Sequence, residues 1–345
     1  MAAARWAPTV DNCQPWSFHW DGAALHIDHD TDRAAGVLNR EGRLSCLSLG
    51  CVLEAVALAA GTEGLAAEAR TSLDEPSTWA TVRFAPTSVP ADDLAATMAS
   101  RCTDRRLYRG GSPLDPVFDR LRGEALRFPD CGLYVVGPCP EELLRYIDET
   151  ESYVWTHDDT YRDVMRWFRF SRAELEATGD GLPWNALGFD LPELGLFRLA
   201  RSPLLPRLAR GRGLSLVARA WLRLLITSSA ALVCITVRSP QKEALSSAGR
   251  LAYRAWLHLN RRGFGVQPVT QHALLAYYHA IGALPSTVRP EFVERFRRGR
   301  GVFSRGFGYP PDELPVWVLR AGLSPSLSAH QRSLRRPLDR IFTSV

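Results

Sequence analysis

Alternating and continuous apolar segments divide the N-terminal part of the chain into short strands and helices. Residues 24–31 and 78–85 alternate apolar with polar side chains, which predicts two half-buried strands. Between them, residues 41–61 form a mostly apolar run that closes at glycine, which is typical of a buried helix. A second helix is predicted near 91–100, after a connection rich in Pro, Ser and Asp.

The remainder of the chain repeats this alternation over longer segments. The pattern predicts helices over 115–127, 140–155, 158–178 and 240–262, and strands over 132–137, 230–237 and 314–322. The strand at 78–85 is faintly similar to the one at 314–322. We therefore advance, as a hypothesis, a duplication into two α+β halves joined near residue 100.

Two segments show neither the alternation of a strand nor the periodicity of a helix. Residues 7–20, APTVDNCQPWSFHW, combine Pro, Asn, Gln and two Trp, and they read as neither strand nor helix. Residues 179–213 are dense in Gly, Pro and bulky apolar side chains, and long segments of this kind are usually lids or binding loops. We predict a lid over 179–225 that favours a small, flat, hydrophobic ligand. Its aromatic side chains include Trp184, Phe189 and Phe197.

The composition permits one large core or two smaller ones, since 46% of the 345 residues are apolar. The formal net charge is +5, and Lys242 is the only lysine among 42 basic residues. Guanidinium groups bind phosphate bidentately, so the chain has ample material for an anion site. The sequence has no basic run interleaved with aromatics, so nucleic acid is not an expected partner. Arg297, Arg298 and Arg300 are interpreted as a solvated loop face.

Cysteine usage and targeting signals favour a reduced, cytoplasmic protein. The seven cysteines are an odd number, and no pair has the CxxC spacing of a zinc or redox site. No secretory signal is visible, and the longest apolar stretches are short for a bilayer, so no integral membrane segment is expected. His26 and Asp28 share one strand face while His29 takes the other, so this cluster is interpreted as solvated and no metal is expected.

Acidic side chains gather around the predicted helix start near residue 158. We interpret them as capping and decorating that helix, because carboxylates favour helix N-termini. They are Glu149, Glu151, Asp158, Asp159 and Asp163.

Three motifs carry a resemblance to a known family. Pro8-Thr9-Val10-Asp11-Asn12-Cys13-Gln14-Pro15-Trp16 resembles the flavin-contacting PS-x-x-N-x-QPW loop of the nitroreductase superfamily, with Thr for Ser. Arg101-Cys102-Thr103-Asp104-Arg105 resembles its R-x-S-x-R phosphate motif, again with Thr for Ser. Arg335-Arg336-Pro337-Leu338-Asp339 resembles its basic pair ahead of a P-L-D/E helix. Members of the superfamily bind FMN between two subunits.

A narrower resemblance is to the Acg-like branch, in which two nitroreductase halves are fused, and NREGRLSC, RCTDRR and PVWVLRAG carry it. It implies an α+β nitroreductase-like fold with residues 1–98, a truncated half, and 99–345 forming an intramolecular pseudo-dimer. Each half would have a mainly antiparallel sheet flanked by helices. Because each half lacks a motif that the other supplies, one FMN per chain is implied, in a monomer or weak homodimer.

The resemblance also assigns roles to residues. It implies that the FMN phosphate is held by Arg101, Thr103, Arg105, Arg335 and Arg336. The flavin ring would meet Pro8, Thr9, Asn12 and Gln14, and its N5 atom would lie near Gly181 and Leu182. Simpler readings stay open, namely a solvated basic edge for the arginines and a turn-forming Asn12. Trp16 is expected in the core.

These features predict an FMN-dependent oxidoreductase that transfers hydride between flavin N5 and a small hydrophobic or aromatic substrate. A dehydrogenation in natural-product biosynthesis is one expected use, with NAD(P)H or O2 as electron partner. The alternatives are an NAD(P)H-dependent nitroreductase, an FMN-storage protein whose lid excludes substrate, and a flavin-free scaffold.

Overall fold

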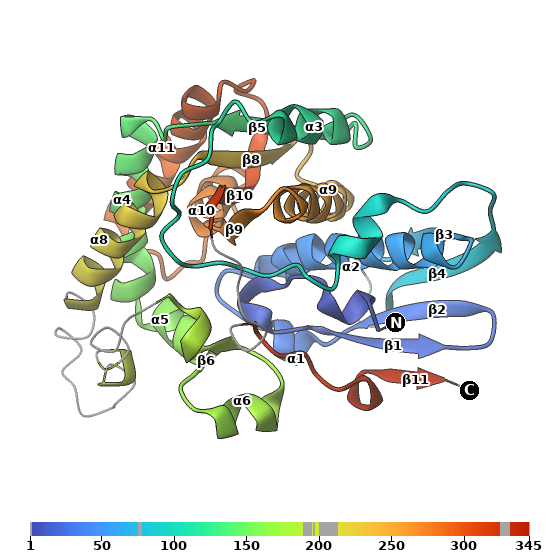
Figure 1. The fold of residues 1–345 in the computed structure, drawn as a ribbon. Coiled ribbons are helices and arrows are strands. Elements are labelled where there is room, and N and C mark those ends of the chain that lie inside the picture. Colours follow the sequence, from blue (N-terminus) through green and yellow to red (C-terminus); the bar gives the residue numbers. More distant parts are fainter. Residues whose placement is uncertain are drawn as a thin grey trace.

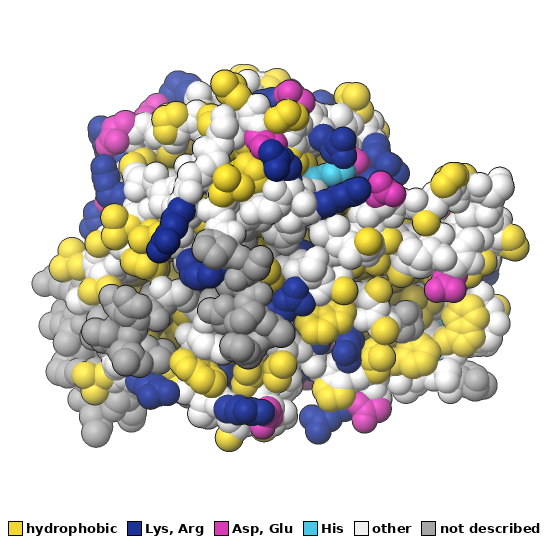
Figure 2. Space-filling model, viewed as in Figure 1, with side chains coloured by type: hydrophobic (Ala, Val, Ile, Leu, Met, Phe, Trp, Pro, Cys, Tyr) yellow, Lys and Arg dark blue, Asp and Glu magenta, His cyan; other side chains and the backbone are white. Residues whose placement is uncertain are grey.

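Two β-sheets lie on either side of a central pair of long helices (Figure 1). The computed structural model describes residues 2–74, 78–188, 195, 197–199, 213–324 and 332–344. The predicted lid therefore lies partly outside the described residues, and so does Phe189. On the face shown in Figure 2, Lys and Arg side chains are scattered among apolar and other side chains.

The first sheet joins the two ends of the chain. Its strands are β1 (Trp16–Trp20), β2 (Ala24–His29), β3 (Leu65–Thr71), β4 (Thr78–Pro86) and β11 (Phe342–Ser344). The order is β11-β1-β2-β4-β3, and only β1 and β11 pair in parallel. The prediction that residues 7–20 contain no strand is wrong at its C-terminal end. β1 forms because it is enclosed between β2 and a strand from the other end of the chain.

The second sheet is antiparallel throughout. Its strands are β5 (Cys131–Val136), β8 (Ala231–Val237), β9 (Phe264–Pro268) and β10 (Leu314–Leu323), in the order β5-β8-β10-β9. Every residue of β8 is buried, which explains its unbroken apolar sequence. The predicted α+β class, with two mainly antiparallel sheets flanked by helices, is confirmed.

The central helices α2 (Arg43–Thr62) and α9 (Lys242–Arg261) pack against each other with their backbones in close approach. A Cβ at Gly50 would overlap the carbonyl oxygen of Ser246, and one at Gly249 would overlap that of Leu47. Residues 40–62 are long and apolar enough to cross a membrane, yet 83% of that apolar stretch is buried inside the protein. This burial is what a core helix requires, and it matches the helix predicted over 41–61.

The remaining helices surround this centre. They are α1 (Thr31–Ala34), α3 (Pro116–Ala125), α4 (Glu141–Thr156), α5 (Asp158–Met165), α6 (Arg172–Thr178), α8 (Leu214–Thr227), α10 (Gln271–Ala280) and α11 (Pro290–Phe307). Short 3-10 turns occur at Ala4–Trp6, Val10–Asn12, Arg40–Gly42, Asp93–Thr97, Trp184–Ala186 and Leu338–Arg340.

Three predictions of elements need correction. The helix predicted over 158–178 is divided, because β6 (Phe168–Arg169) pairs in parallel with β7 (Leu182–Pro183) and Ser171 then caps a new helix. The helix predicted near 91–100 is only the 3-10 turn at Asp93–Thr97. The basic residues interpreted as a loop lie on α11, where Arg297 pairs with Glu294 of the same helix and Arg298 with Glu149 of α4.

Candidate functional site

A cavity of about 340 Å³ lies beside the central helix pair and collects residues from both ends and the middle of the chain. The opening loop, the segment after the first half, α4, α9, α10 and the C-terminal segment all contribute to it. Its lining includes Pro8, Thr9, Asp11, Asn12, Leu44, Arg101, Thr103, Arg105, Glu151, Leu182, Trp256, Gln271, His272, Trp317 and Arg335. Most of the residues that the motifs predicted therefore converge on one space.

The loop that opens the chain has an unusual backbone. Asp11, Asn12 and Gln14 have φ angles of 49°, 57° and 50°, in the left-handed region that non-glycine residues rarely adopt. Such conformations cost free energy and persist only where neighbouring contacts enforce them. The neighbours here are two segments far away in sequence.

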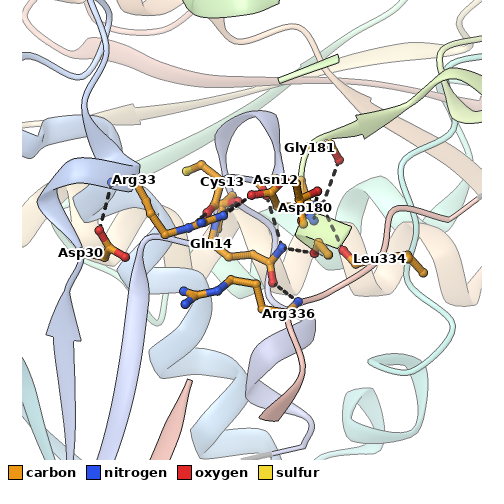
Figure 3. Close-up of polar contacts among 12 residues, drawn as sticks. Asn12, Cys13, Gln14, Asp30, Arg33, Asp180, Gly181, Leu334 and Arg336 are labelled. Atoms are coloured by element: carbon orange, nitrogen blue, oxygen red, sulfur yellow. Dashed lines mark hydrogen bonds and ion pairs between the residues drawn. The ribbon is translucent and has the colours of Figure 1, made fainter. Parts of the chain in front are cut away.

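Figure 3 shows how this loop is held. The Asn12 side-chain amide donates to the carbonyls of Gly181 and Leu334, at 3.0 Å each. Gln14 donates to the Gly179 carbonyl at 3.0 Å and accepts from the backbone N–H of Arg336 at 2.8 Å. The loop thus ties the segment after α6 to the C-terminal segment.

Three predicted residues lie behind the cavity wall rather than on it. Gln14 and Arg336 are absent from the lining, since Gln14 braces the loop and the Arg336 side chain donates to the Arg340 carbonyl. Gly181 is also behind the wall, and its backbone N–H donates to the Asn12 carbonyl at 3.3 Å. Its neighbour Leu182 does line the cavity.

The ion pairs of Asp180 add to this brace. Asp180 accepts from Arg33 of α1 and, at 2.5 Å, from Arg169 of β6, and together they fix the residue before Gly181. These contacts position residues 179–182, the start of the predicted lid, against α1 and β6.

One end of the cavity is cationic. Arg101 is 6% exposed, and its Nη2 donates to the Trp6 carbonyl while Nε and Nη1 have no partner. Its guanidinium lies 4.6 Å from the centre of the Trp256 ring. Burial, together with the charge of Arg101, lowers the pKa of Arg335 to about 9. Burial also lowers the pKa of Arg105 to about 10.

These guanidiniums form no close ion pair, although the charge of Asp11 acts on Arg105 and raises its pKa against the effect of burial. Among the described residues, no carboxylate forms an ion pair with Arg101, Arg105 or Arg335. Their protein acceptors are backbone carbonyls, those of Trp6, Ala186 and Arg5 among them. A buried charge without a counter-ion is costly, and an anionic ligand would remove that cost. This end of the cavity therefore has the chemistry of a phosphate or carboxylate site.

A carboxyl group lies on another wall of the cavity. Glu151 of α4 is 7% exposed, and its Oε1 accepts from Trp155 Nε1 at 2.8 Å. Its Oε2 accepts from the side-chain amide of Gln271, and His272 Nε2 lies 3.5 Å away. Burial raises the pKa of Glu151 to about 7, against the two hydrogen bonds that favour its charged form.

Sequence reasoning missed Glu151 by treating it as helix decoration. A signal for it was present, because Ile147, Glu151 and Trp155 follow one another at four-residue spacing on the apolar face of α4. Glutamate is rarely buried unless its carboxyl group has a partner, so a glutamate on an apolar helix face indicates a specific structural or functional role.

The other acidic residues near 158 differ in their roles. Asp158 and Asp159 lie in the first turn of α5, as predicted, whereas the prediction is wrong for Asp163, which accepts from the backbone N–H of the distant Val37. In the HIDHD segment, His26 bonds Asp21 at 2.7 Å and His29 stacks on Trp79. Trp16 is fully buried, as expected.

Aromatic side chains of the predicted lid pack next to the Glu151 wall. The Phe197 ring centre lies 5.5 Å from that of Trp155 and 5.8 Å from that of Phe168. Trp184 packs against the same hydrophobic cluster. This region of the site is therefore apolar, in contrast to the arginine end.

The α+β fold and a cavity lined by most of the motif residues are the features that the motifs predict for a nitroreductase-like protein. A curated relative supports this class. The chain is 25% identical over 315 residues to PigM of Serratia sp., described as a probable NAD(P)H nitroreductase, and the match covers 86% of each chain. The similarity to nitroreductases predicted from the motifs is confirmed, whereas the Acg-like branch stays a prediction.

Solved nitroreductase structures resemble the fold more distantly. A nitroreductase with bound FMN from Desulfitobacterium hafniense is 13% identical, covers 74% of this chain and 98% of its own, and gives a TM-score of 0.38. A putative nitroreductase from Anabaena variabilis is 12% identical, covers 88% of this chain and 69% of its own, and gives 0.43. We draw no argument from superpositions this loose. No family model matches the sequence.

Proposed function

We propose that this protein is an FMN-dependent oxidoreductase that binds one FMN per chain in the cavity described above. The observation that carries the proposal is the cationic end of that cavity. There the buried Arg101 and the half-buried Arg105 and Arg335 form no ion pair with a carboxylate among the described residues. An FMN phosphate is a dianion and would supply the missing negative charge.

The residues present fit the cofactor. Arg101 offers two unpartnered donors, Nε and Nη1, and Thr103 adds a hydroxyl on the same wall. Asn12 can still accept a hydrogen bond. Its side-chain oxygen, Oδ1, is buried without a donor, whereas its side-chain nitrogen already donates to the carbonyls of Gly181 and Leu334. The pyrimidine edge of the flavin ring carries an N–H that would satisfy this oxygen.

When bound, FMN supplies hydride chemistry at its N5 atom. The chain's own contribution is binding, orientation and exclusion of water. The arginine end fixes the phosphate, the strained Asn12 loop positions the ring, and Leu44, Leu182 and Trp317 give the cavity apolar walls. The apolar side chains around the cavity favour a small, flat, hydrophobic substrate beside the cofactor.

The direction of turnover is the finer part of the proposal. The description of the Serratia relative as a probable NAD(P)H nitroreductase supports NAD(P)H as electron donor, with reduction of a nitro compound as one use. Dehydrogenation of an aromatic substrate in natural-product biosynthesis is the other, and it would run the same hydride transfer in reverse.

A spectrum of the purified protein tests the proposal directly. We expect flavin absorption at one FMN per chain, or its appearance when FMN is added to cofactor-free protein. Anaerobic NADPH should then bleach the flavin, and a nitroarene should restore the colour. A colourless protein that does not bind added FMN would refute the proposal, whereas a bound flavin inert to every donor would favour FMN storage.

A further inference from the structure

The position of Glu151 points to a second chemical role for the cavity. Among the described residues of its lining, only Asp11 and Glu151 are acidic, and they have different surroundings. Burial raises the pKa of Asp11 to about 6, and the positive charge of Arg105 partly opposes this shift. Glu151 instead meets neutral donors, Trp155 Nε1 and the Gln271 amide, one at each oxygen.

The charged groups around Glu151 do not neutralise it. Asp148 lies one turn earlier on α4, and its own charge is paired with Arg219 of α8. From α10, the His272 ring faces Glu151 at 3.5 Å. No Arg or Lys of the described chain forms an ion pair with this carboxyl group.

Hydrogen bonding assigns the tautomer of His272. The Thr150 hydroxyl donates to the Tyr146 carbonyl at 2.7 Å, so it accepts from His272 Nδ1 at 2.8 Å. The Nδ1 atom therefore carries the hydrogen, and Nε2 presents a lone pair to Glu151. Burial lowers the pKa of His272 to about 3, so the ring stays neutral and the carboxyl group is the site that gains or loses a proton.

We infer that Glu151 is the acid–base residue of this site, exchanging a proton with the substrate as hydride moves between substrate and flavin. This inference rests on the proposed FMN function. In oxidation of an alcohol or amine, the C–H bond breaks and its hydride goes to oxidised flavin. The proton of the O–H or N–H bond goes to the Glu151 carboxylate, and a C=O or C=N bond forms.

The reverse reaction is balanced in the same way. A quinone takes a hydride from reduced flavin and a proton from the Glu151 carboxyl group, and the product is a hydroquinone. Since both protonation states are accessible near neutral pH, one residue can serve both directions.

Quinone reduction by the flavin-loaded protein provides the first test. Dithionite-reduced wild type, E151Q and E149Q are mixed anaerobically with 1,4-benzoquinone, and flavin reoxidation is followed between pH 5.5 and 8.5. We expect reoxidation of E151Q to slow about 100-fold and to lose the dependence on a group with a pKa near 7. Glu149 is the matched control, because it lies on the same helix, pairs with Arg298 and does not line the cavity.

Thermal unfolding of the flavin-free protein is the second test. Because the folded pKa of Glu151 is raised from 4.5 to about 7, wild-type stability should fall as pH rises between these values. The difference in melting temperature between E151Q and wild type should therefore shift in favour of E151Q by several degrees from pH 5 to pH 8. The corresponding difference for E149Q should not change with pH.

The outcomes separate this inference from the proposed function. A wild type that binds no FMN would refute the function itself. Yellow wild type and E151Q with equal FMN affinity and equal reoxidation rates at every pH would overturn only the role of Glu151. A pH-independent difference in melting temperature would show that Glu151 does not titrate as the inference requires.

Discussion

Arg101 and Arg320 are both buried arginines, yet their surroundings differ. Every side-chain nitrogen of Arg320 has an acceptor, with Nε on Gln267 Oε1 at 2.7 Å, Nη1 on the Leu225 carbonyl at 3.2 Å and Nη2 on the Arg106 carbonyl at 2.7 Å. Arg101 has two donors without partners. Arg320 therefore serves the fold, while Arg101 keeps binding capacity for a ligand.

Replacing Arg101 by Met should separate stability from binding. Removing a buried, uncompensated charge should raise the melting temperature of flavin-free R101M, because apolar replacement of unpaired buried charge is often stabilising. The same change should weaken FMN binding about 100-fold, since charge-assisted hydrogen bonds contribute about 3 kcal/mol. Differential scanning fluorimetry and FMN titration measure the two effects.

R320M is the control for this pair. It would remove the hydrogen bonds to the Gln267 amide oxygen and to the carbonyls of Leu225 and Arg106, so it should destabilise the protein by about 3 kcal/mol. If R101M were destabilised to the same degree and still bound FMN normally, Arg101 would be a structural residue.

Asn12 is expected to act on both the loop and the ring. Asn12→Ala removes two hydrogen bonds to the Gly181 and Leu334 carbonyls, and this should lower the free energy of unfolding by about 2 kcal/mol in urea. FMN should be retained with altered reactivity. Asn39, which caps a local turn outside the cavity, is a control, because N39A should affect stability but leave flavin reactivity unchanged.

Among the helices, the α2–α9 contact depends on two glycines that let the backbones meet. Gly50→Ala would push a methyl group into the Ser246 carbonyl, so we expect a loss of about 3 kcal/mol and a reduced yield of folded protein. Gly61→Ala, on the same helix, meets only ordinary contact with Ala91 at 3.9 Å and should be neutral or slightly stabilising. Equal melting temperatures for the two variants would contradict this account of the contact.

The strength of a local pattern decided which elements were predictable. α2, α9 and β8 have long, regular patterns, and all were predicted close to their observed bounds. β1 was missed because its parallel partner is β11, and no local pattern reveals a partner at the other end of the chain. The break between α5 and α6 likewise depends on the distant pairing of β6 with β7.

At the scale of the whole molecule, an ion network centred on a buried arginine joins segments that are far apart in the sequence. Arg254 of α9 pairs with Glu54 of α2, with Asp92 ahead of the first 3-10 turn after β4, and with Glu124 of α3. His258 also reaches Glu124, at 2.9 Å. Each carboxylate has a cationic or imidazole partner, so the network is satisfied as long as these groups stay charged.

This network should make the protein sensitive to acid. Burial opposes ionisation of Glu124, but His258 and Arg254 together lower its pKa from 4.5 to about 2. Its contribution of about 2 kcal/mol should be complete above pH 4.5 and lost as pH falls toward 2. Urea unfolding of wild type and E124Q between pH 2 and 6 measures it, and the two should converge at low pH. E63Q, changed at an exposed helix end, should follow wild type throughout.

The order of side chains along the chain was enough to identify the α+β class, the two central helices and the motifs around Asn12, Arg101 and Arg335. Periodicity and short motifs are local properties, and these features depend on little else. Packing in three dimensions determined that Gln14 and Arg336 brace the loop from behind, and that Glu151 lines the cavity beside His272. These placements depend on contacts between segments far apart in the chain, which create burial and unpaired charge that no single segment contains.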